Sequence, residues 1–571
     1  MAGLSFKYLR LTIHSNMKNK FSLFTAICFA MLAFAACEKP VSQLAVYVPK
    51  DASAVFTIDT KAIMDKIASS GITIDSLANM LTKNNDEFAL HWNDIKNSGI
   101  NLNKPLYAFV KQTNSIQQGN IQSSGIIAEI DDAKKIEAFL KKEKVGADVL
   151  SGGKYQYIAL GDDYVAGWTD KILIISNVSG GNASPGKYST GEGTLSQLQL
   201  TTLFTQNESA SIASLGEFRD MLAKPGDIHF FTNASMNLGN MGMLGMTKAN
   251  ALLQGTYSEG AINFDKGKII ASGETHYNKT LTDILDKYPS KEINLDMIKS
   301  YPDTLSGFGI IAFNPKVLVD ILHYLGFDMM ADGFTSNMGF TTTDVVNAFS
   351  GDIAVMFSPR SDKTMGMMPH TPGFLLSIAI GDKTAFDKVL NGLLNKQILT
   401  KNGDEYQLGL AGGHGFVIET GNNNLFISSS DELIKAYQSG SKNALPADVE
   451  KEVSNKSMAV YVDINTLLNN KSAKDSSVNI HLRDSHYIFN ISQAAKATFK
   501  NLIATTDKSD GKSITGNFEL NFVNTNENSL ASLVKFISIA HEEEMKHKND
   551  PQMFPPPGMM NDSTQPDKDD N

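Results

Sequence analysis

The sequence predicts an α+β protein of two duplicated domains, in which antiparallel sheets have amphipathic helices packed on one face. Three observations lead to this prediction. Apolar runs that alternate with a period of two are bounded by Gly, Asn and Asp, which is typical of strands joined by tight turns. Fewer segments show the apolar spacing of an amphipathic helix. One strand–helix unit recurs along the chain, and its copies fall in the same order twice.

The recurring unit consists of an apolar strand, a polar residue and a segment with helical periodicity. The polar residue lies where the strand ends and the helix begins, at Asp59, Asp131, Asn233, Asn314, Asp382 and Asp463. Asp and Asn side chains at this position accept hydrogen bonds from the free N–H groups of the first helical turn. We therefore interpret these residues as helix caps and not as catalytic acids.

The units fall into two homologous halves. Residues Ile130–Leu140 align without a gap with Ile380–Leu390, and a hairpin with a Gly turn stands near the end of each half, at Phe264–Tyr277 and Ser509–Phe522. A repeat of this length indicates a duplicated domain and not a solenoid. The prediction is a first α+β repeat over residues 47–299 and a second over residues 300–545.

Further local signals complete the predicted elements. Hairpins are expected across Thr169–Asp170 and Gly421–Asn423, where turn residues separate two apolar strands. Helical segments around Thr280–Lys287 and Ser529–Ala540 close the two halves. The tail, residues 546–571, is rich in Pro, Asp and Asn and is predicted to be disordered.

The N-terminal segment is predicted to be a bacterial lipoprotein signal peptide over residues 1–36, with Met17 as the expected start. A short basic stretch precedes an apolar run that is shorter than the roughly 20 residues of a membrane-spanning helix. The sequence FAAC at Phe34–Cys37 resembles the lipobox that the lipoprotein signal peptidase cleaves. The expected modification is lipidation of Cys37, with the lipid bilayer as partner and residues 37–46 as anchor and linker.

Cysteine usage and charge exclude several functions. The chain has two cysteines, and Cys28 lies in the segment that is removed, so Cys37 would be the remaining thiol. This excludes a disulfide framework and a thiolate metal site in the mature protein. The net charge of −10 becomes −14 after loss of residues 1–36, which hold four basic residues and no acids. Such a balance argues against a nucleic-acid partner.

The motifs that could support catalysis or metal binding are weak, so we expect no catalytic, cofactor-binding or metal-ligating residue and no cofactor. The two histidines of His541–His547 are six residues apart, whereas the zinc-protease helix needs a spacing of four. The Ser-x-x-Lys motifs at Ser151, Ser184 and Ser509 contain glycines and are interpreted as turns. Single histidines are interpreted as hydrogen-bonded structural residues: His91, His229, His276, His323, His370 and His414.

Methionine is concentrated in three groups. Soft thioethers bind Cu(I) or form an adaptable apolar binding surface, but filling of the core is the favoured interpretation. The groups are Met236, Met241, Met243 and Met246, then Met329, Met330 and Met338, then Met365, Met367 and Met368.

The segment YVPKDASAVFTIDTKAIMDKI from Tyr47, with its run Pro49, Asp51, Ala52 and Ser53 after the lipobox, resembles a family of Bacteroidota lipoproteins known only as domain of unknown function 4836. The resemblance covers nearly the whole mature chain. It implies a location in the Gram-negative cell envelope, at the outer membrane, with the periplasmic or surface face left open. It implies no catalytic residue.

The sequence thus favours a membrane-anchored envelope lipoprotein that acts as a non-enzymatic binding or scaffolding module. Two alternatives stay open. One is an envelope hydrolase whose site has no recognisable motif, and the other is a ligand-capture lipoprotein that serves an importer. The protein or small molecule that would bind is not specified by the residues.

Overall fold

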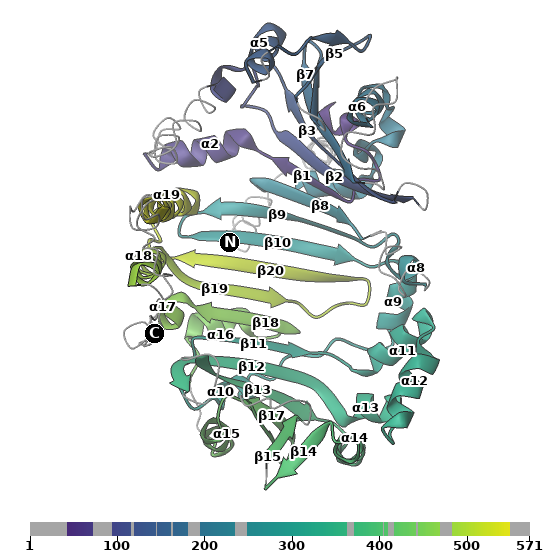
Figure 1. Ribbon diagram of the computed structural model, residues 1–571, viewed down its shortest axis with the longest axis vertical. Helices are drawn as coiled ribbons and strands as arrows, with labels where there is room; N and C mark the ends of the chain where they lie inside the picture. Colours follow the sequence, from purple (N-terminus) through teal and green to yellow (C-terminus); the bar gives the residue numbers. More distant parts are fainter. Residues whose placement is uncertain are drawn as a thin grey trace, which may run out of the picture.

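The computed structural model describes residues 43–71, 94–115, 119–143, 146–160, 164–180, 195–234, 248–362, 371–403, 405–408, 416–440, 444–468 and 482–548. These residues form one antiparallel sheet of 20 strands with helices along its sides and over its ends (Figure 1). The α+β class with antiparallel strands is therefore confirmed. No helix in these ranges is both long enough and apolar enough to span a bilayer.

The strands form two sets of ten. The first set is β1 (Ala54–Ile58), β2 (Leu106–Ser115), β3 (Gly119–Glu129), β4 (Leu150–Ser151), β5 (Gln156–Ala159), β6 (Tyr164–Trp168), β7 (Ile172–Gly180), β8 (Ile228–Asn233), β9 (Tyr257–Asp265) and β10 (Lys268–His276). The second set is β11 (Gly307–Ala312), β12 (Phe349–Asp362), β13 (Thr371–Ile380), β14 (Leu399–Asn402), β15 (Glu405–Leu408), β16 (Val417–Thr420), β17 (Asn424–Ser428), β18 (Met458–Asp463), β19 (Phe499–Thr506) and β20 (Ser513–Phe522).

The helices follow the same chain order. Those of the first half are η1 (Gln43–Tyr47), α2 (Thr60–Ser69), α5 (Ala133–Glu143), α6 (Leu195–Thr205), η2 (Glu208–Ala210), η3 (Ile212–Ser214), α7 (Gly216–Ala223), α8 (Ala249–Leu253), α9 (Lys279–Leu285) and α10 (Asp296–Lys299). Those of the second half are α11 (Lys316–Leu325), α12 (Asp328–Asn337), α13 (Thr342–Ala348), α14 (Lys383–Asn395), α15 (Asp431–Gln438), α16 (Ala447–Val453), α17 (Ile464–Leu468), α18 (Leu482–Thr498) and α19 (Ser529–Lys548).

The two sets of strands are paired in the same order. The first runs β4-β5-β6-β7-β3-β2-β1-β8-β9-β10. The second runs β14-β15-β16-β17-β13-β12-β11-β18-β19-β20. This matched order is what a duplication predicts, while the division of the chain between residues 299 and 300 stays a prediction.

The two sets meet along one seam, where β10 and β20 pair antiparallel from Lys268 opposite Asn521 to His276 opposite Ser513. The repeat pattern predicts a sheet for each half. The structure joins them because the last strand of each half would otherwise leave its backbone groups unpaired at a sheet edge.

Most of the predicted helix caps are confirmed. The carboxylates of Asp59, Asp382 and Asp463 each accept a hydrogen bond from the N–H group three residues further on, at 2.9, 3.0 and 2.7 Å. Oδ1 of Asn314 accepts from the N–H group of Lys316 at 3.1 Å. These residues therefore have the structural role that their repeated position indicated.

The prediction for Asp131 is wrong by one residue. Oδ1 of Asp132 accepts the N–H group of Lys134 at 2.9 Å and caps α5, whereas Oδ1 of Asp131 accepts from Nδ2 of Asn101 at 2.8 Å. Two adjacent acids satisfy the capping pattern equally well in sequence. Asn233 ends β8, and the segment 235–247 that follows lies outside the described residues.

The four predicted hairpins are confirmed as β6–β7, β16–β17, β9–β10 and β19–β20. The two closing helices are present as α9 and α19. Helix α19 extends to Lys548, so the disorder predicted from residue 546 is wrong for its first three residues, and residues 549–571 lie outside the described ranges.

Two large apolar cores cover one face of the sheet. In the first half η1, α6 and α7 pack on β1, β2, β7 and β8, and in the second half α10, α15 and α16 pack on β11, β12 and β18. Neighbouring residues in a strand point to opposite faces. Ile174 belongs to the first core and Leu173 packs with α5, so α5 covers the other face at that end of the sheet. Helix α14 covers the other end in the same way, with Leu425.

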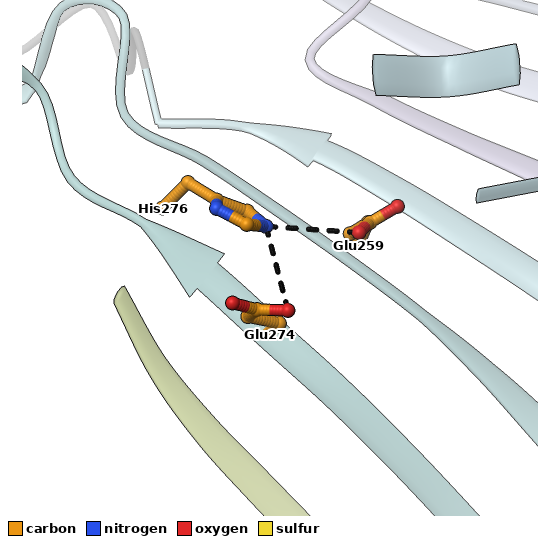
Figure 2. A group of neighbouring side chains, drawn as sticks. All are labelled: Glu259, Glu274 and His276. Carbon is orange, nitrogen blue, oxygen red and sulfur yellow. Dashed lines mark ion pairs between the residues drawn. The ribbon is translucent and has the colours of Figure 1, made fainter. Parts of the chain in front are cut away.

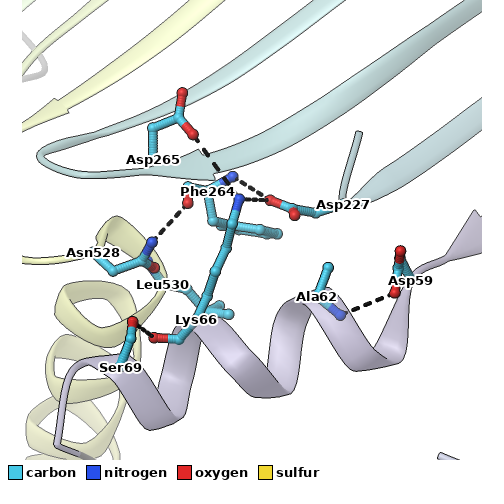
Figure 3. A network of polar contacts seen from close by, with 9 residues as sticks. All are labelled: Asp59, Ala62, Lys66, Ser69, Asp227, Phe264, Asp265, Asn528 and Leu530. Carbon is cyan, nitrogen blue, oxygen red and sulfur yellow. Dashed lines mark hydrogen bonds and ion pairs between the residues drawn. The ribbon is translucent and has the colours of Figure 1, made fainter. Parts of the chain in front are cut away.

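Polar contacts tie α2 and α19 to the ends of the central strands (Figure 3). Nζ of Lys66 in α2 lies 2.5 Å from Oδ2 of Asp227, just before β8. Nδ2 of Asn528 donates to the carbonyl oxygen of Phe264 in β9 at 2.7 Å. Because Asn528 follows β20 in the chain, this contact links the two halves beside their seam.

Candidate functional site

Between α5 and α14, the face of the sheet opposite the two cores is lined by apolar side chains. Residues that pair directly across strands lie on the same face, so the strand registers define its members. We call this surface the apolar face: Phe56, Ile126, Phe230, Ile262, Phe264, Ile269, Phe518, Leu520, Leu502, Val460, Ile311 and Phe357.

Four side chains of the apolar face are exposed to solvent, two in each half, whereas Ile269 beside the seam is only 9% exposed. Phe56 is 40% exposed, Ile126 50%, Ile311 37% and Phe357 36%. In Figure 1, helices α2, α17, α18 and α19 stand along one side of the central strands, and α8, α9, α11 and α12 along the other. Because Ile269 of β10 pairs with Leu520 of β20, the apolar face continues across the seam between the two halves.

Two glycines near the centre of the apolar face make room for an aromatic ring. The ring of Phe230 lies over Gly260 and Gly273, and a Cβ atom on either glycine would come within 2.4 or 2.9 Å of the ring. Such distances are far shorter than van der Waals contact between carbon atoms. Glycine is therefore required at both positions for the ring to lie against the backbone.

A cavity of about 550 Å³ adjoins the apolar face at one side of the sheet. Ile311, Met458 and Ile514 of the sheet contribute to its lining, together with Leu285 of α9 and Val317 of α11. Cavities of roughly 300–1,000 Å³ with mainly apolar linings are typical of small-molecule sites.

The polar end of this cavity is acidic. It is lined by Asp286, Asp510 and Tyr277. Hydrogen bonds from backbone N–H groups lower the pKa of Asp510, which keeps this carboxylate ionised. Burial raises the pKa of Tyr277, so its hydroxyl group stays protonated. An amphiphile with a neutral, zwitterionic or cationic head fits this end better than one with an anionic head.

The opposite face of the same strands carries a cluster of ionisable side chains (Figure 2). Glu259 comes from β9, while Glu274 and His276 come from β10. Nε2 of His276 lies 3.6 Å from Oε1 of Glu259 and 3.7 Å from Oε2 of Glu274. Glu259 is only 6% exposed, and Oε1 of its carboxylate also pairs with Lys224 at 2.6 Å.

The predicted lipidation site, Cys37, lies outside the described residues, so lipidation stays a prediction. The first and third methionine groups also lie outside them. The second group does not form one thioether site, because Met329 and Met330 are 88% and 55% exposed on α12 whereas Met338 is buried in the core with α14.

The interpretation of single histidines as hydrogen-bonded structural residues is confirmed at two positions. Nε2 of His229 lies 2.9 Å from the carbonyl oxygen of Lys224, and Nδ1 of His323 lies 3.0 Å from Asp328. It is wrong at His276, whose Nε2 is buried and has no hydrogen-bond partner among the described residues.

No curated protein matches this chain. Among solved structures, TP0453 in crystal form III is 8% identical, with a TM-score of 0.25 over 44% of this chain and 87% of that chain. Crystal form I of TP0453 is 9% identical, with a TM-score of 0.24 over 42% and 81%. A family model described as a domain of unknown function (DUF4836) matches residues 45–530, which confirms the resemblance found in the sequence. The chain therefore belongs to the DUF4836 family.

Proposed function

We propose that this protein is a lipid-anchored protein of the cell envelope that binds an acyl chain of a lipid on its apolar face, and that it acts by binding and not by catalysis. The observation that carries the proposal is the apolar face itself, which crosses the seam and keeps Phe56, Ile126, Ile311 and Phe357 open to solvent. Large apolar patches on soluble domains mark ligand or membrane sites.

An acyl chain fits the shape and chemistry of this surface. Burying about 16 methylene groups contributes roughly 13 kcal/mol at about 0.8 kcal/mol each, before the entropy of association is subtracted. The cavity beside Ile311 offers a place for one end of such a chain, and the acids Asp286 and Asp510 favour a head group without net negative charge. We therefore propose a zwitterionic or neutral lipid as the ligand.

The proposed anchor would keep the protein near this ligand. The first described residue, Gln43, follows Cys37 by six positions, and six extended residues span at most about 20 Å. A diacylated and further acylated cysteine is a stable tether. Lipidation of Cys37 would thus hold the body of the protein close to a bilayer surface.

A local observation favours binding over hydrolysis. Ser509 is the described serine of a Ser-x-x-Lys motif that lines the cavity. Its Oγ donates to the carbonyl oxygen of Ser513 at 2.7 Å and accepts the N–H group of Gly511 at 3.0 Å. The hydroxyl is engaged in this turn. Tyr277, which forms a hydrogen bond with it, stays protonated and does not supply the base that a serine nucleophile needs.

Titration with a phosphatidylcholine that carries a dansyl group on one acyl chain, followed by displacement with unlabelled phosphatidylcholine, tests acyl-chain binding. The full chain with Cys37→Ala, purified without detergent, should bind the probe saturably. Ile311→Asp should weaken binding by more than about 10-fold, since it puts a charge on the apolar face. Leu150→Asp is the matched control, because Leu150 is 46% exposed on the outermost strand β4 and lies outside the apolar face. Non-saturable binding, or equal effects of the two substitutions, would contradict the proposal.

Metabolic labelling with palmitate tests the anchor separately. The unmodified protein and a Cys28→Ala variant should both be labelled, whereas Cys37→Ala should not be. Label retained in Cys37→Ala would refute lipidation at this residue without bearing on the apolar face.

A further inference from the structure

We propose that Glu259, Glu274 and His276 form a binding site for a divalent transition-metal ion. The site lies on the face of β9 and β10 opposite the apolar face, and the proposal does not depend on what binds there. The three ligand atoms lie within 4.8 Å of one another. Figure 2 shows the imidazole directed toward both carboxylates.

The distances between the side chains fit a metal ion at the centre. Zinc binds imidazole nitrogen and carboxylate oxygen at about 2.0–2.2 Å, so two ligands of a tetrahedral ion are about 3.4 Å apart. The two distances from Nε2 of His276, 3.6 Å to Glu259 and 3.7 Å to Glu274, exceed this value by a few tenths of an ångström. Small side-chain movements would close the site, and a position would remain for water or a fourth ligand.

Two of the polar atoms in the cluster are buried without a hydrogen-bond partner among the described residues. They are Oε2 of Glu259 and Nε2 of His276, and Glu259 is only 6% exposed. An unsatisfied buried polar group costs about 1–3 kcal/mol, more if it is charged. A bound cation would satisfy both atoms at once, which explains why they are held together here.

Neighbouring residues hold the imidazole in place and add negative charge. The ring of Tyr257 stacks on His276 with the centroids 4.6 Å apart and the planes 19° apart. Glu217 and Asp220 also lie close enough to Tyr257 to interact with it electrostatically. The negative charge around the cluster favours a cation over a neutral ligand.

Lys224 is the cation that a metal ion would have to displace. Its Nζ lies 2.6 Å from Oε1 of Glu259, and its side chain is 50% exposed. An exposed lysine can move into solvent at little cost. Removing this charge should therefore strengthen metal binding, which is the opposite of the effect of removing a ligand.

The ligand set indicates the class of ion. Imidazole with carboxylates suits zinc and neighbouring transition metals, whereas calcium and magnesium take oxygen ligands alone. The proposed occupant is therefore a transition-metal ion, and Zn²⁺ is the appropriate probe.

Isothermal titration of the full chain with Zn²⁺, with both cysteines replaced by Ala, tests the site. We expect one ion per chain, and Ca²⁺ and Mg²⁺ should not bind there. His276→Gln and Glu274→Gln should each weaken Zn²⁺ binding by more than about 10-fold, since even loss of an outer-shell partner costs 10–100-fold. Lys224→Met should strengthen binding. His323→Gln is the matched control, because His323 pairs with Asp328 on the surface far along the chain.

Thermal unfolding without metal separates loss of binding from loss of fold. A His276→Gln variant that keeps the unfolding midpoint of the parent and loses the Zn²⁺ heat would support the site. If Zn²⁺ does not bind the parent chain at a defined stoichiometry, or if His276→Gln and His323→Gln reduce binding equally, the site does not exist. Weaker binding in Lys224→Met would also contradict the proposed geometry.

Discussion

Nζ of Lys66 lies 2.5 Å from Oδ2 of Asp227, whose side chain is only 5% exposed. This largely buried ion pair connects α2 to the residue just before β8. The same carboxylate oxygen accepts the N–H group of Phe264 at 2.7 Å (Figure 3). A single acid thus joins a helix near the N-terminus to the hairpin that leads to the seam.

Replacing Lys66 with Met should lower the free energy of unfolding by about 2–3 kcal/mol, because it leaves the buried carboxylate of Asp227 with a backbone hydrogen bond but no opposite charge. Urea denaturation followed by circular dichroism measures the change. Lys61→Met is the matched control on the same helix. Its partner Asp65 is 65% exposed, so this substitution should cost clearly less than Lys66→Met. Equal costs would show that the burial of Asp227 does not matter.

Two glycines with similar backbone angles should respond differently to substitution by Ala. Gly351 has φ of +90° and a Cβ there would lie 2.0 Å from the carbonyl oxygen of Phe313, whereas Gly339 has φ of +87° and open space around it. Gly339→Ala should cost about 1–2 kcal/mol through backbone strain alone. Gly351→Ala should cost clearly more, because the backbone must also move, and differential scanning calorimetry would compare the two. A smaller effect at Gly351 would refute the close approach.

The acid dependence of stability should include a contribution from Asp344. Hydrogen bonds from Lys388 and Thr341 lower the pKa of this carboxyl from 3.8 to about 2. A group whose pKa is lower in the folded state stabilises the fold above its unfolded pKa and loses that effect as the pH falls through the folded pKa. The difference in unfolding midpoint between the parent and Asp344→Asn should therefore be largest above pH 4 and shrink between pH 4 and pH 2.

A difference that stays constant over this range would contradict the lowered pKa of Asp344. Thr341→Ala provides a second check, since it removes the side-chain donor of the same capping box. Its effect should shrink over the same interval of pH.

The cap of α5 can be tested with two adjacent substitutions. Asp132→Ala should lower stability by about 1 kcal/mol, the usual cost of losing an N-cap side chain. Asp131→Ala removes an exposed contact with Asn101, and should cost less than about 0.5 kcal/mol. Chemical denaturation of both variants distinguishes the observed cap from the one that the repeat pattern predicted. A larger effect at Asp131 than at Asp132 would contradict the cap seen in the structure.

The cluster around His276 can be predicted from the sequence through the register of the β9–β10 hairpin, although the isolated position of His276 in the chain does not indicate it. The two-residue turn at Lys266 and Gly267 was recognised as a hairpin. With Asp265 opposite Lys268, the register places Glu259 opposite Glu274 and Tyr257 opposite His276. Glu274 and His276 are two residues apart and so share a face of the strand. Glu259, in contrast, lies on the neighbouring strand, so only the register of the hairpin brings it together with Glu274 and His276.

The apolar face, in contrast, cannot be predicted from hairpin registers and alternation in the sequence. Each of its strands shows ordinary alternation, and alternation alone does not tell which of two apolar faces a helix will cover. Val460 of the apolar face and Tyr461 of a large core are adjacent in β18, and both are compatible with a buried position. Only the packing of α10, α15 and α16 shows which side is covered.

By itself, the sequence determined the local features of this protein: the caps at Asp59, Asp382 and Asp463, the four hairpins, the α+β class and the repeated order of units. These features depend mainly on residues a few positions apart, so short stretches of the sequence are enough to predict them. Tertiary structure decided that β10 pairs with β20, that one sheet spans both halves, and that Glu259 meets His276 on one face while the other stays apolar. Those outcomes depend on which distant surfaces bury each other, and short sequence patterns do not encode that choice.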